Sequence, residues 1–230
     1  MIEERDWLAV ERALVVEGHR VVGLDEVGRG ALAGPVLVGA VVVVTDALPP
    51  VGLNDSKLLS AHQREQLVEP IKAWSLDWSV GESSADEVDT WGIQWAIALA
   101  ARRAIAALRV APSIALIDGP HNLLRPSGSG SRIDQLDVGR EVPDHRCIVR
   151  GDQTCATIAA AAVVAKVHRD RLMVELADQF PHYGWATNVG YGSPAHLEAL
   201  RRFGPSPLHR TSWRLPSPNA VSDSSAASTK

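Results

Sequence analysis

Two spacings of hydrophobic residues alternate along this chain, and each spacing predicts a different kind of element. Short runs rich in Val, Ile and Leu predict strands at residues 20–26, 34–45, 76–83, 113–118 and 146–152. Apolar residues at helical spacing predict helices at residues 4–17, 60–74, 84–110, 156–180 and 194–203. Two early strands followed by alternating helices and strands indicate an α/β layer fold with a mixed sheet.

Three stretches carry neither spacing and are predicted to be irregular. Residues 121–145 are rich in Gly, Ser, Pro and mixed charges, which is typical of a long surface loop. Residues 181–193 form a second loop with three glycines. The last residues, 216–230, have the composition of a disordered tail.

Composition narrows the class of protein. At 230 residues, with 46% hydrophobic and 22% charged residues, the chain resembles a soluble globular protein with one well-buried domain. No apolar run approaches the ~18 residues that a membrane span needs, and the acidic start MIEERDW is unlike a secretory signal. Two cysteines, Cys147 and Cys155, make no disulfide framework or zinc cluster. These features favour reduced thiols and a cytoplasmic location.

The charge balance leaves the question of nucleic-acid binding open. The net charge of −4 argues weakly against it. However, residues 199–215 contain Arg201, Arg202, Arg210 and Arg214 with no acidic residue. A basic face and a scatter of solvated charges remain equal alternatives for this segment.

Acidic residues close three of the predicted strands: Asp25 with Glu26, then Asp118, then Asp152. Sites in open α/β sheets form beyond the strand ends, so neighbouring strands would gather these four carboxylates. Such a cluster requires protonation or intervening cations. Carboxylate oxygens suit Mg²⁺ or Mn²⁺, and pairs of such ions ~4 Å apart serve phosphate chemistry. The pattern therefore predicts metal-dependent phosphate chemistry.

A plain structural role is the alternative for each acid, because an isolated acid at a strand end usually caps a turn or faces water. Asp25 and Glu26 would point to opposite faces of a regular strand, so they can converge only at a bulge or a strand end. The Gly28-Arg29-Gly30 run supplies backbone freedom just downstream. Its amides and guanidinium suit a phosphate or a sugar hydroxyl. Its spacing fits neither a P-loop nor a dinucleotide-binding motif.

Five motifs, in order, resemble those of one family: GLDEVGRGALAGPVLVGAVV, GLNDSKLLS, ALIDGP, IAAAAVVAKVHRD and GYGSPAHLEAL. The family is bacterial ribonuclease HII, a type 2 ribonuclease H, and the likeness covers residues 19–214. The resemblance implies a ribonuclease H-like fold with a mixed five-stranded sheet flanked by helices. It divides the chain into an N-terminal helix (1–18), a catalytic domain (19–180), a C-terminal substrate-binding helical segment (181–215) and the tail (216–230).

The resemblance also implies the reaction. Members of this family hydrolyse RNA in RNA–DNA hybrids and cut 5′ of single ribonucleotides in duplex DNA, leaving a 3′-hydroxyl and a 5′-phosphate. They use Mg²⁺ or Mn²⁺, and two divalent ions per site are expected. A monomer acting on these nucleic acids in the cytoplasm is the corresponding expectation for this chain.

The matching positions assign roles to particular residues. The metal-binding carboxylates match Asp25, Glu26, Asp118 and Asp152. The remaining matches are to substrate contacts: Gly28, Arg29 and Gly30 for sensing the 2′-hydroxyl, Tyr191 for packing on the sugar at the RNA–DNA junction, and Lys57 and Lys166 near the nucleic-acid backbone. Structural alternatives remain for three of them. Tyr191 is alternatively a loop anchor, Lys57 a solvated charge and Lys166 a lysine that extends from a buried helix face.

Three departures from the family pattern bear on the fourth carboxylate and on one contact. Arg150 stands where the family often has Lys before Gly-Asp, and 34 residues separate Asp118 from Asp152, more than expected. Rivals for the fourth ligand are Asp134, Asp137, Asp144 and Asp170. Val189 replaces a common lysine before Gly-Tyr, which would weaken one backbone contact.

Two other functions compete with the ribonuclease. A non-catalytic hybrid-binding module on the same fold would lack a motif carboxylate, and none is missing. A metal-dependent nuclease or strand-transfer enzyme of similar fold that acts on plain DNA would not need the Gly-Arg-Gly run or Tyr191. Ribonuclease HIII normally carries an additional N-terminal domain, whereas only ~18 residues precede the first predicted strand here.

Overall fold

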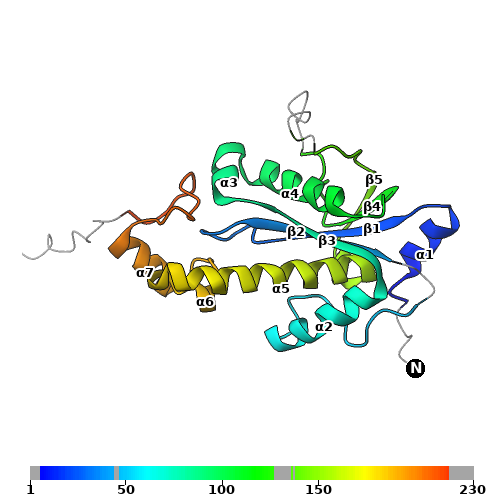
Figure 1. The fold of residues 1–230 in the computed structure, drawn as a ribbon, viewed down its shortest axis with the longest axis horizontal. Coiled ribbons are helices and arrows are strands. Elements are labelled where there is room, and N and C mark those ends of the chain that lie inside the picture. The colour runs from blue at the N-terminus through cyan, green and yellow to red at the C-terminus, as the bar shows by residue number, and fades with distance from the viewer. Residues whose placement is uncertain (1–5, 44–46, 127–135, 137, 218–230) are drawn as a thin grey trace, which may run out of the picture.

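A five-stranded mixed sheet forms the centre of the protein (Figure 1). The computed structural model describes residues 6–43, 47–126, 136 and 138–217. The strands are β1 (Val21–Val27), β2 (Val36–Val43), β3 (Ser75–Ser83), β4 (Ile114–Asp118) and β5 (Asp144–Ile148). Their order across the sheet is β3-β2-β1-β4-β5. The β1–β2 and β2–β3 pairs are antiparallel, and the β1–β4 and β4–β5 pairs are parallel. The predicted α/β fold with a mixed sheet is confirmed.

Helices cover both faces of this sheet (Figure 1). They are α1 (Ala9–Val16), α2 (Ala61–Trp74), α3 (Ala85–Trp91), α4 (Ile93–Ala107), α5 (Ala156–Gln179), α6 (Trp185–Asn188) and α7 (Pro194–Phe203). Helix α4 packs on one face with a core that includes Val38 and Ala100. Helices α2 and α5 pack on the other, around Val41, Ile71 and Ala160.

Helix α5 lies unusually close to the sheet because its first half consists of small residues and faces two strand glycines. A Cβ atom at Gly39 would lie 2.3 Å from the carbonyl oxygen of Ala161, and one at Gly23 would lie 2.3 Å from the carbonyl carbon of Thr157. No side chain fits at either place. This contact fixes the position of α5 relative to β1 and β2.

The C-terminal segment packs on the second half of α5 and then runs back to the turn that follows β1. Met173, Trp185 and Leu200 form a separate small core there. The turn after β1 is joined to this segment by backbone hydrogen bonds, from Leu32 N to Gly190 O at 2.8 Å and from Gly34 N to Leu208 O at 2.8 Å. The motif after β1 and the loop before α7 are therefore neighbours, although far apart in sequence.

Three predicted elements differ from those observed. The helix predicted at 84–110 is two helices, because Gly92 adopts a φ of +81° between α3 and α4. The strand predicted at 146–152 begins at Asp144 and ends at Ile148. The predicted loop 181–193 contains α6 and a single 3₁₀ turn.

Some predictions fall wholly or partly outside the described residues. These include most of the tail 216–230 and the middle of the predicted loop 121–145. The N-terminal helix begins at Ala9 rather than residue 4, and residues 1–5 are not described. Within the described ranges, no helix combines the length and apolar character that crossing a bilayer requires.

Candidate active site and its relatives

Asp25 and Asp118 are brought together by strand pairing. Leu24 of β1 lies opposite Ile117 of the parallel strand β4, so the next residue of each strand is an aspartate. Asp25 is 8% exposed. Buried aliphatic residues occupy both strands up to this point, which places the two carboxylates at the edge of the core.

Asp152 reaches the same place from a turn, which corrects its predicted position at a strand end. It lies in a 3₁₀ turn, Gly151–Gln153, that follows β5. Arg150 precedes it in the left-handed region at φ 58°, an uncommon conformation for a residue with a side chain. Asp118 Oδ1 accepts hydrogen bonds from the backbone N–H of Gly151 at 2.7 Å and of Asp152 at 3.4 Å. The turn is thus fastened to the carboxylate of β4.

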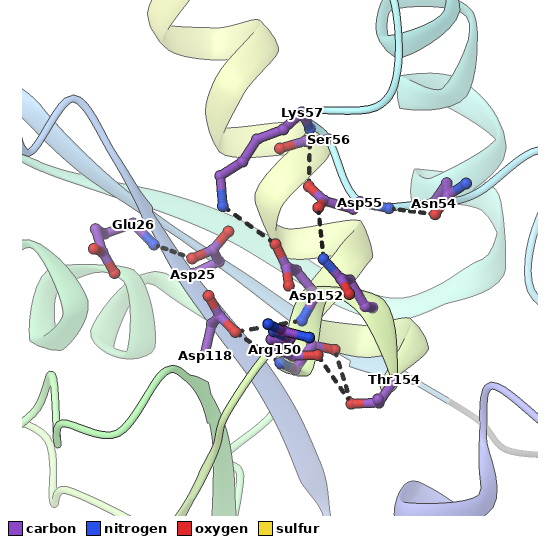
Figure 2. A network of polar contacts seen from close by, with 12 residues as sticks. Asp25, Glu26, Asn54, Asp55, Ser56, Lys57, Asp118, Arg150, Asp152 and Thr154 are labelled. Atoms are coloured by element: carbon purple, nitrogen blue, oxygen red, sulfur yellow. Dashed lines mark hydrogen bonds and ion pairs between the residues drawn. The ribbon is translucent and has the colours of Figure 1, made fainter.

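Glu26 is oriented differently from its neighbours. Asp25 pairs with Gly39 and Glu26 with Val38 in regular antiparallel register. The expected bulge between the two acids is therefore absent from this part of β1, and successive side chains alternate as in any strand. Glu26 Oε1 accepts a hydrogen bond from Arg29 Nε at 2.7 Å. Figure 2 shows the Asp25, Asp118 and Asp152 carboxyl groups turned toward one another, with the Glu26 carboxyl group apart.

The loop before α2 contributes a cation and an additional acid to the site. Lys57 Nζ lies 3.3 Å from Asp152 Oδ2 (Figure 2). Asp55, which is 4% exposed, accepts hydrogen bonds from the Lys57 backbone N–H at 2.9 Å and from Gln153 Nε2 at 3.2 Å. Asp55 therefore orients both the lysine and the turn that carries Asp152.

Electrostatics make the cluster costly to ionise. Burial, followed by the charges of Glu26, Asp118 and Asp152, raises the pKa of Asp25 well above its ordinary value. Burial and then Asp118 likewise raise the pKa of Asp152. Burial opposes the charge on Lys57, but attraction to Asp152 outweighs it and raises the pKa of Lys57. The fold thus holds acids where their charged forms require a cation.

The donor set fits a hard divalent cation, although the ligands are not arranged for one. Among the described residues, no group of three or more His, Cys, Asp or Glu side chains is placed to hold a metal ion. The expected gathering of four carboxylates is therefore only partial, because Glu26 pairs with Arg29 apart from the other three and Lys57 occupies Asp152 Oδ2. Oxygen-only ligands suit Mg²⁺ or Mn²⁺, which would favour the ionised forms that burial opposes.

A cavity of about 250 Å³ opens at these acids. Its lining includes the acids Asp25, Glu26 and Asp118 and the cations Lys57, Arg64 and Lys166. Gly28, Arg29, Gly30 and Tyr191 complete it, so every predicted substrate contact lines the same cavity. This mixture of acids and cations suits a ligand that carries both metal-binding and exposed anionic groups.

The lysines and the tyrosine have additional contacts. Lys166 Nζ donates a hydrogen bond to Asp170 Oδ1 at 2.7 Å and lies 5.9 Å from the centre of the Tyr191 ring. Lys166 is in the middle of α5. The Tyr191 carbonyl oxygen lies 2.8 Å from His196 Nδ1. The backbone of Tyr191 is thus anchored, while its ring borders the cavity.

The rival ligands are separated from the cluster where they can be placed. Asp144 pairs with Ile114 at the opposite end of the parallel strands from Asp118. Asp170 contacts Lys166 and Arg64 instead of the acids. Asp134 and Asp137 lie outside the described residues.

Several residues of the site were missed by the sequence interpretation. Asp55 lies within the GLNDSKLLS motif, whose clustered polar residues were the signal that could have indicated it. Arg64 Nη1 donates hydrogen bonds to the carbonyl oxygens of Ser56 and Leu59, at 2.9 Å and 2.5 Å, and so shapes the Lys57 loop. Its place in the first turns of α2 gave no indication of this contact.

Comparison with known proteins identifies the family. The family model described as Ribonuclease HII matches residues 22–215, which include every residue of the candidate site. The chain belongs to the ribonuclease HII family. A Ribonuclease HII from Cereibacter sphaeroides is 46% identical over 210 residues, covering 91% of this chain and 91% of the relative. Another, from Streptomyces avermitilis, is 43% identical over 206 residues, 89% of this chain and 82% of the relative.

Solved structures agree with this assignment. The crystal structure of the ribonuclease H2 from Pyrococcus horikoshii aligns with a TM-score of 0.67 and 26% identity, covering 85% of this chain and 94% of that one. The ribonuclease H-like fold and the family expected from the five motifs are both confirmed. The protein is therefore a metal-dependent endoribonuclease that hydrolyses RNA in RNA–DNA hybrids.

Proposed function

We propose that the enzyme cuts on the 5′ side of ribonucleotides, including a single ribonucleotide embedded in duplex DNA, and leaves a 3′-hydroxyl and a 5′-phosphate. Two Mg²⁺ or Mn²⁺ ions held by Asp25, Glu26, Asp118 and Asp152 would serve this reaction. The main support is the buried Asp25 carboxyl group. Burial and three neighbouring acids raise its pKa, and it lines a cavity that cations also line.

The four acids offer different oxygens to such ions. When bound, divalent ions stabilise the charge that develops on the attacked phosphodiester and lower the pKa of the attacking water. Asp118 commits Oδ1 to the backbone of the Gly151 turn, which leaves Oδ2 for a ligand bond. Asp152 Oδ2 is engaged by Lys57, a contact that a stronger cation would weaken. Glu26 reaches the cavity beside Arg29.

Recognition of the ribonucleotide would fall to the backbone after β1. Gly28 has a φ of +85°, and a Cβ atom at Gly30 would have no heavy atom within 4 Å. The chain at Gly30 is thus open to a close approach by a sugar. Only RNA offers a 2′-hydroxyl there. A site that hydrogen-bonds this hydroxyl discriminates strongly against a deoxyribonucleotide, which lacks it. Tyr191 lines the same cavity and offers an apolar face to the neighbouring sugar.

Phosphates of the substrate would contact the cations of the cavity. Lys57, Arg64 and Lys166 come from three separate segments and all line it. Contacts of this kind hold the nucleic acid in register without reading its sequence. They supply local attraction in a protein whose net charge is −4.

Cleavage of matched duplexes tests this proposal. Three duplexes of one sequence would be compared in Mg²⁺ and in Mn²⁺: an RNA–DNA hybrid, a DNA duplex with one ribonucleotide, and an all-DNA duplex. We expect cuts in the first two only, with the single ribonucleotide at the 5′ end of the downstream product. Asp118→Asn should abolish both cuts.

Each alternative has its own outcome in that assay. Equal cutting of the all-DNA duplex would favour a general nuclease, and binding without cutting would favour a hybrid-binding module. Cutting of the hybrid alone would overturn the single-ribonucleotide activity. Action as a monomer in the cytoplasm is part of the proposal, and sedimentation equilibrium would reveal a dimer.

A further inference from the structure

Two arginines are completely buried beneath the substrate-facing segments. Arg169 of α5 and Arg210 near the C-terminus each have 0% exposure. Within the described residues, their guanidinium hydrogen bonds end on backbone carbonyl oxygens and not on carboxylates. Buried cations normally have an acidic partner, because removing a charge from water is costly. This arrangement therefore needs a reason beyond packing.

Arg210 donates hydrogen bonds to the turn that follows β1. Its Nη2 atom donates to Gly28 O at 2.8 Å and to Gly34 O at 3.1 Å, and its Nη1 atom donates to Arg29 O at 2.9 Å. A trans peptide unit points its C=O and N–H in opposite directions. With the carbonyls of Gly28 and Arg29 turned toward Arg210, the amide N–H groups of Arg29 and Gly30 face away from it. Those two residues line the cavity.

Arg169 joins the same turn to the loop that carries Tyr191. It donates from Nε to Pro35 O at 2.9 Å, from Nη2 to Ala33 O at 3.1 Å and from Nη1 to Val189 O at 2.8 Å. Its guanidinium carbon lies 5.4 Å from the centre of the Tyr191 ring. A single planar group thus sets the distance between the two segments that border the cavity.

Backbone conformation around this contact is strained. Val189 has a φ of 43°, which is unfavourable for a β-branched residue. Strained residues persist where the surrounding structure holds them, often beside functional groups. The hydrogen bond from Arg169 to the Val189 carbonyl oxygen is one such restraint. Space is equally tight, because a Cβ atom at Gly28 would lie 2.2 Å from Arg169 Nε.

The two cations remain charged in spite of their burial. Burial, followed by repulsion from Arg169, lowers the pKa of Arg210 to about 10, and burial lowers the pKa of Arg169. Both are protonated at neutral pH. A guanidinium donates in one plane in several directions, so each can hold three carbonyl oxygens, which a lysine ammonium cannot do in the same geometry.

We propose that Arg169 and Arg210 are positioning residues for ribonucleotide recognition: they fix the outward amides of Arg29 and Gly30 and the Tyr191 ring at the spacing that fits one 2′-hydroxyl-bearing sugar. This inference rests on the proposed function, because it assigns 2′-hydroxyl recognition to the same cavity. Neither arginine touches the substrate.

Binding in a non-cleaving background separates positioning from stability. The parent protein would carry Asp118→Asn, and fluorescence anisotropy in Mg²⁺ would give its Kd for a duplex with one ribonucleotide and for the all-DNA duplex. The Kd for the all-DNA duplex divided by the Kd for the duplex with one ribonucleotide reports recognition of the 2′-hydroxyl. In Arg210→Lys and in Arg169→Lys we expect this ratio to fall by about fivefold, the scale of one hydrogen bond to a hydroxyl.

Arg102→Lys provides the matched control. Arg102 is 8% exposed and donates to the carbonyl oxygens of Leu124 and Leu136, at 3.1 Å and 3.3 Å, and neither of these residues lines the cavity. Its replacement should lower the melting temperature as Arg210→Lys does, while the Kd ratio stays that of the parent. A general loss of stability would weaken binding of both duplexes alike and leave the ratio unchanged.

The outcomes distinguish the proposed ribonucleotide recognition from the positioning role of the two arginines. A Kd ratio of one in the Asp118→Asn protein would overturn both. A Kd ratio well above one that Arg210→Lys and Arg169→Lys both preserve would overturn the positioning role alone. Should one variant fail to fold, the other decides the question, since each arginine holds its own set of carbonyls.

Discussion

Lys57 Nζ lies 3.3 Å from Asp152 Oδ2, so a side chain that is 76% exposed reaches a carboxylate that is 5% exposed. This ammonium is one of the cations that balance the acidic cluster when no metal is bound. An exposed lysine adds at most ~1 kcal/mol through such a pair. A divalent ion among the same acids would take over this balancing role.

Replacement of Lys57 by Met should therefore affect stability mainly when divalent ions are removed. We expect the melting temperature in EDTA to fall by about 2–4 °C, as ~1 kcal/mol does in a protein of this size. In Mn²⁺ the fall should be smaller. Lys57→Arg keeps the charge and serves as the control. Equal falls with and without Mn²⁺ would mean that the lysine and the metal do not act on the same acids.

Replacement of Asp25 by Asn should separate activity from stability. We expect the cleavage rate to drop by at least about a hundredfold, while the melting temperature in EDTA stays the same or rises. The reason is that burial and three acids already raise the pKa of Asp25, so the neutral side chain relieves repulsion. Cleavage rates and thermal melts of the same preparation would check both parts.

Asp77→Asn is the matched control for Asp25→Asn. Asp77 is 4% exposed, but its Oδ2 atom accepts hydrogen bonds from the backbone N–H of Arg109 at 2.6 Å and of Val110 at 3.0 Å. Burial opposes its charge, and these bonds outweigh burial and lower its pKa. Its neutralisation should therefore lower the melting temperature and leave cleavage intact. Similar stability changes in both variants would refute the electrostatic assignment of Asp25.

The sequence already contained the element order and most of the site. The helix Ala61–Trp74 matches the predicted helix 60–74, and Asp25 and Asp118 are neighbours, as their positions at strand ends predicted. These features depend on local pattern, which a single sequence displays. The position of Asp152 could not be read this way, because it depends on the left-handed conformation of Arg150.

Buried cations were the least predictable part of the site. Arg210 was grouped with three other arginines of residues 199–215 as a candidate basic face, yet it is fully buried. Arg201 instead pairs with Glu198 at the surface. An arginine that holds backbone carbonyls and one that faces water have the same sequence signature, since the carbonyls come from segments more than a hundred residues away.

The two buried histidines of the C-terminal segment should make stability depend on pH. His209 Nε2 lies 3.0 Å from His196 Nε2, and its Nδ1 atom accepts a hydrogen bond from the Ser206 backbone N–H at 2.9 Å. Burial, and then His196, lower the pKa of His209 from its ordinary 6.5 to about 4. The folded state thus keeps this ring neutral, while the unfolded chain takes up a proton below pH 6.5.

The His209 contribution to stability is therefore present above pH 6.5 and is lost progressively as the pH falls toward 4. Melting temperatures across this range should decline more steeply for the unmodified protein than for His209→Gln, which offers a donor and an acceptor but does not titrate. Parallel declines for the two proteins would show that His209 is not the responsible group.

The close contact between α5 and the sheet should be intolerant of a single methyl group. Gly39→Ala would place Cβ 2.3 Å from Ala161 O, so we expect a loss of about 1–3 kcal/mol in the free energy of unfolding. Gly30→Ala meets no heavy atom within 4 Å and should leave that free energy unchanged. Urea denaturation would measure both. If Gly30→Ala also slows cleavage, the slowing reflects crowding of the substrate rather than unfolding.

Anomalous diffraction from crystals grown with Mn²⁺ would test most directly whether the acids of β1, β4 and the Gly151–Gln153 turn form one metal centre. We expect manganese peaks with oxygens of Asp25 and Asp118 within about 2.0–2.6 Å and with Asp152 turned away from Lys57 toward an ion. Well-ordered crystals in saturating Mn²⁺ that show no peak between these carboxylates would contradict the assignment.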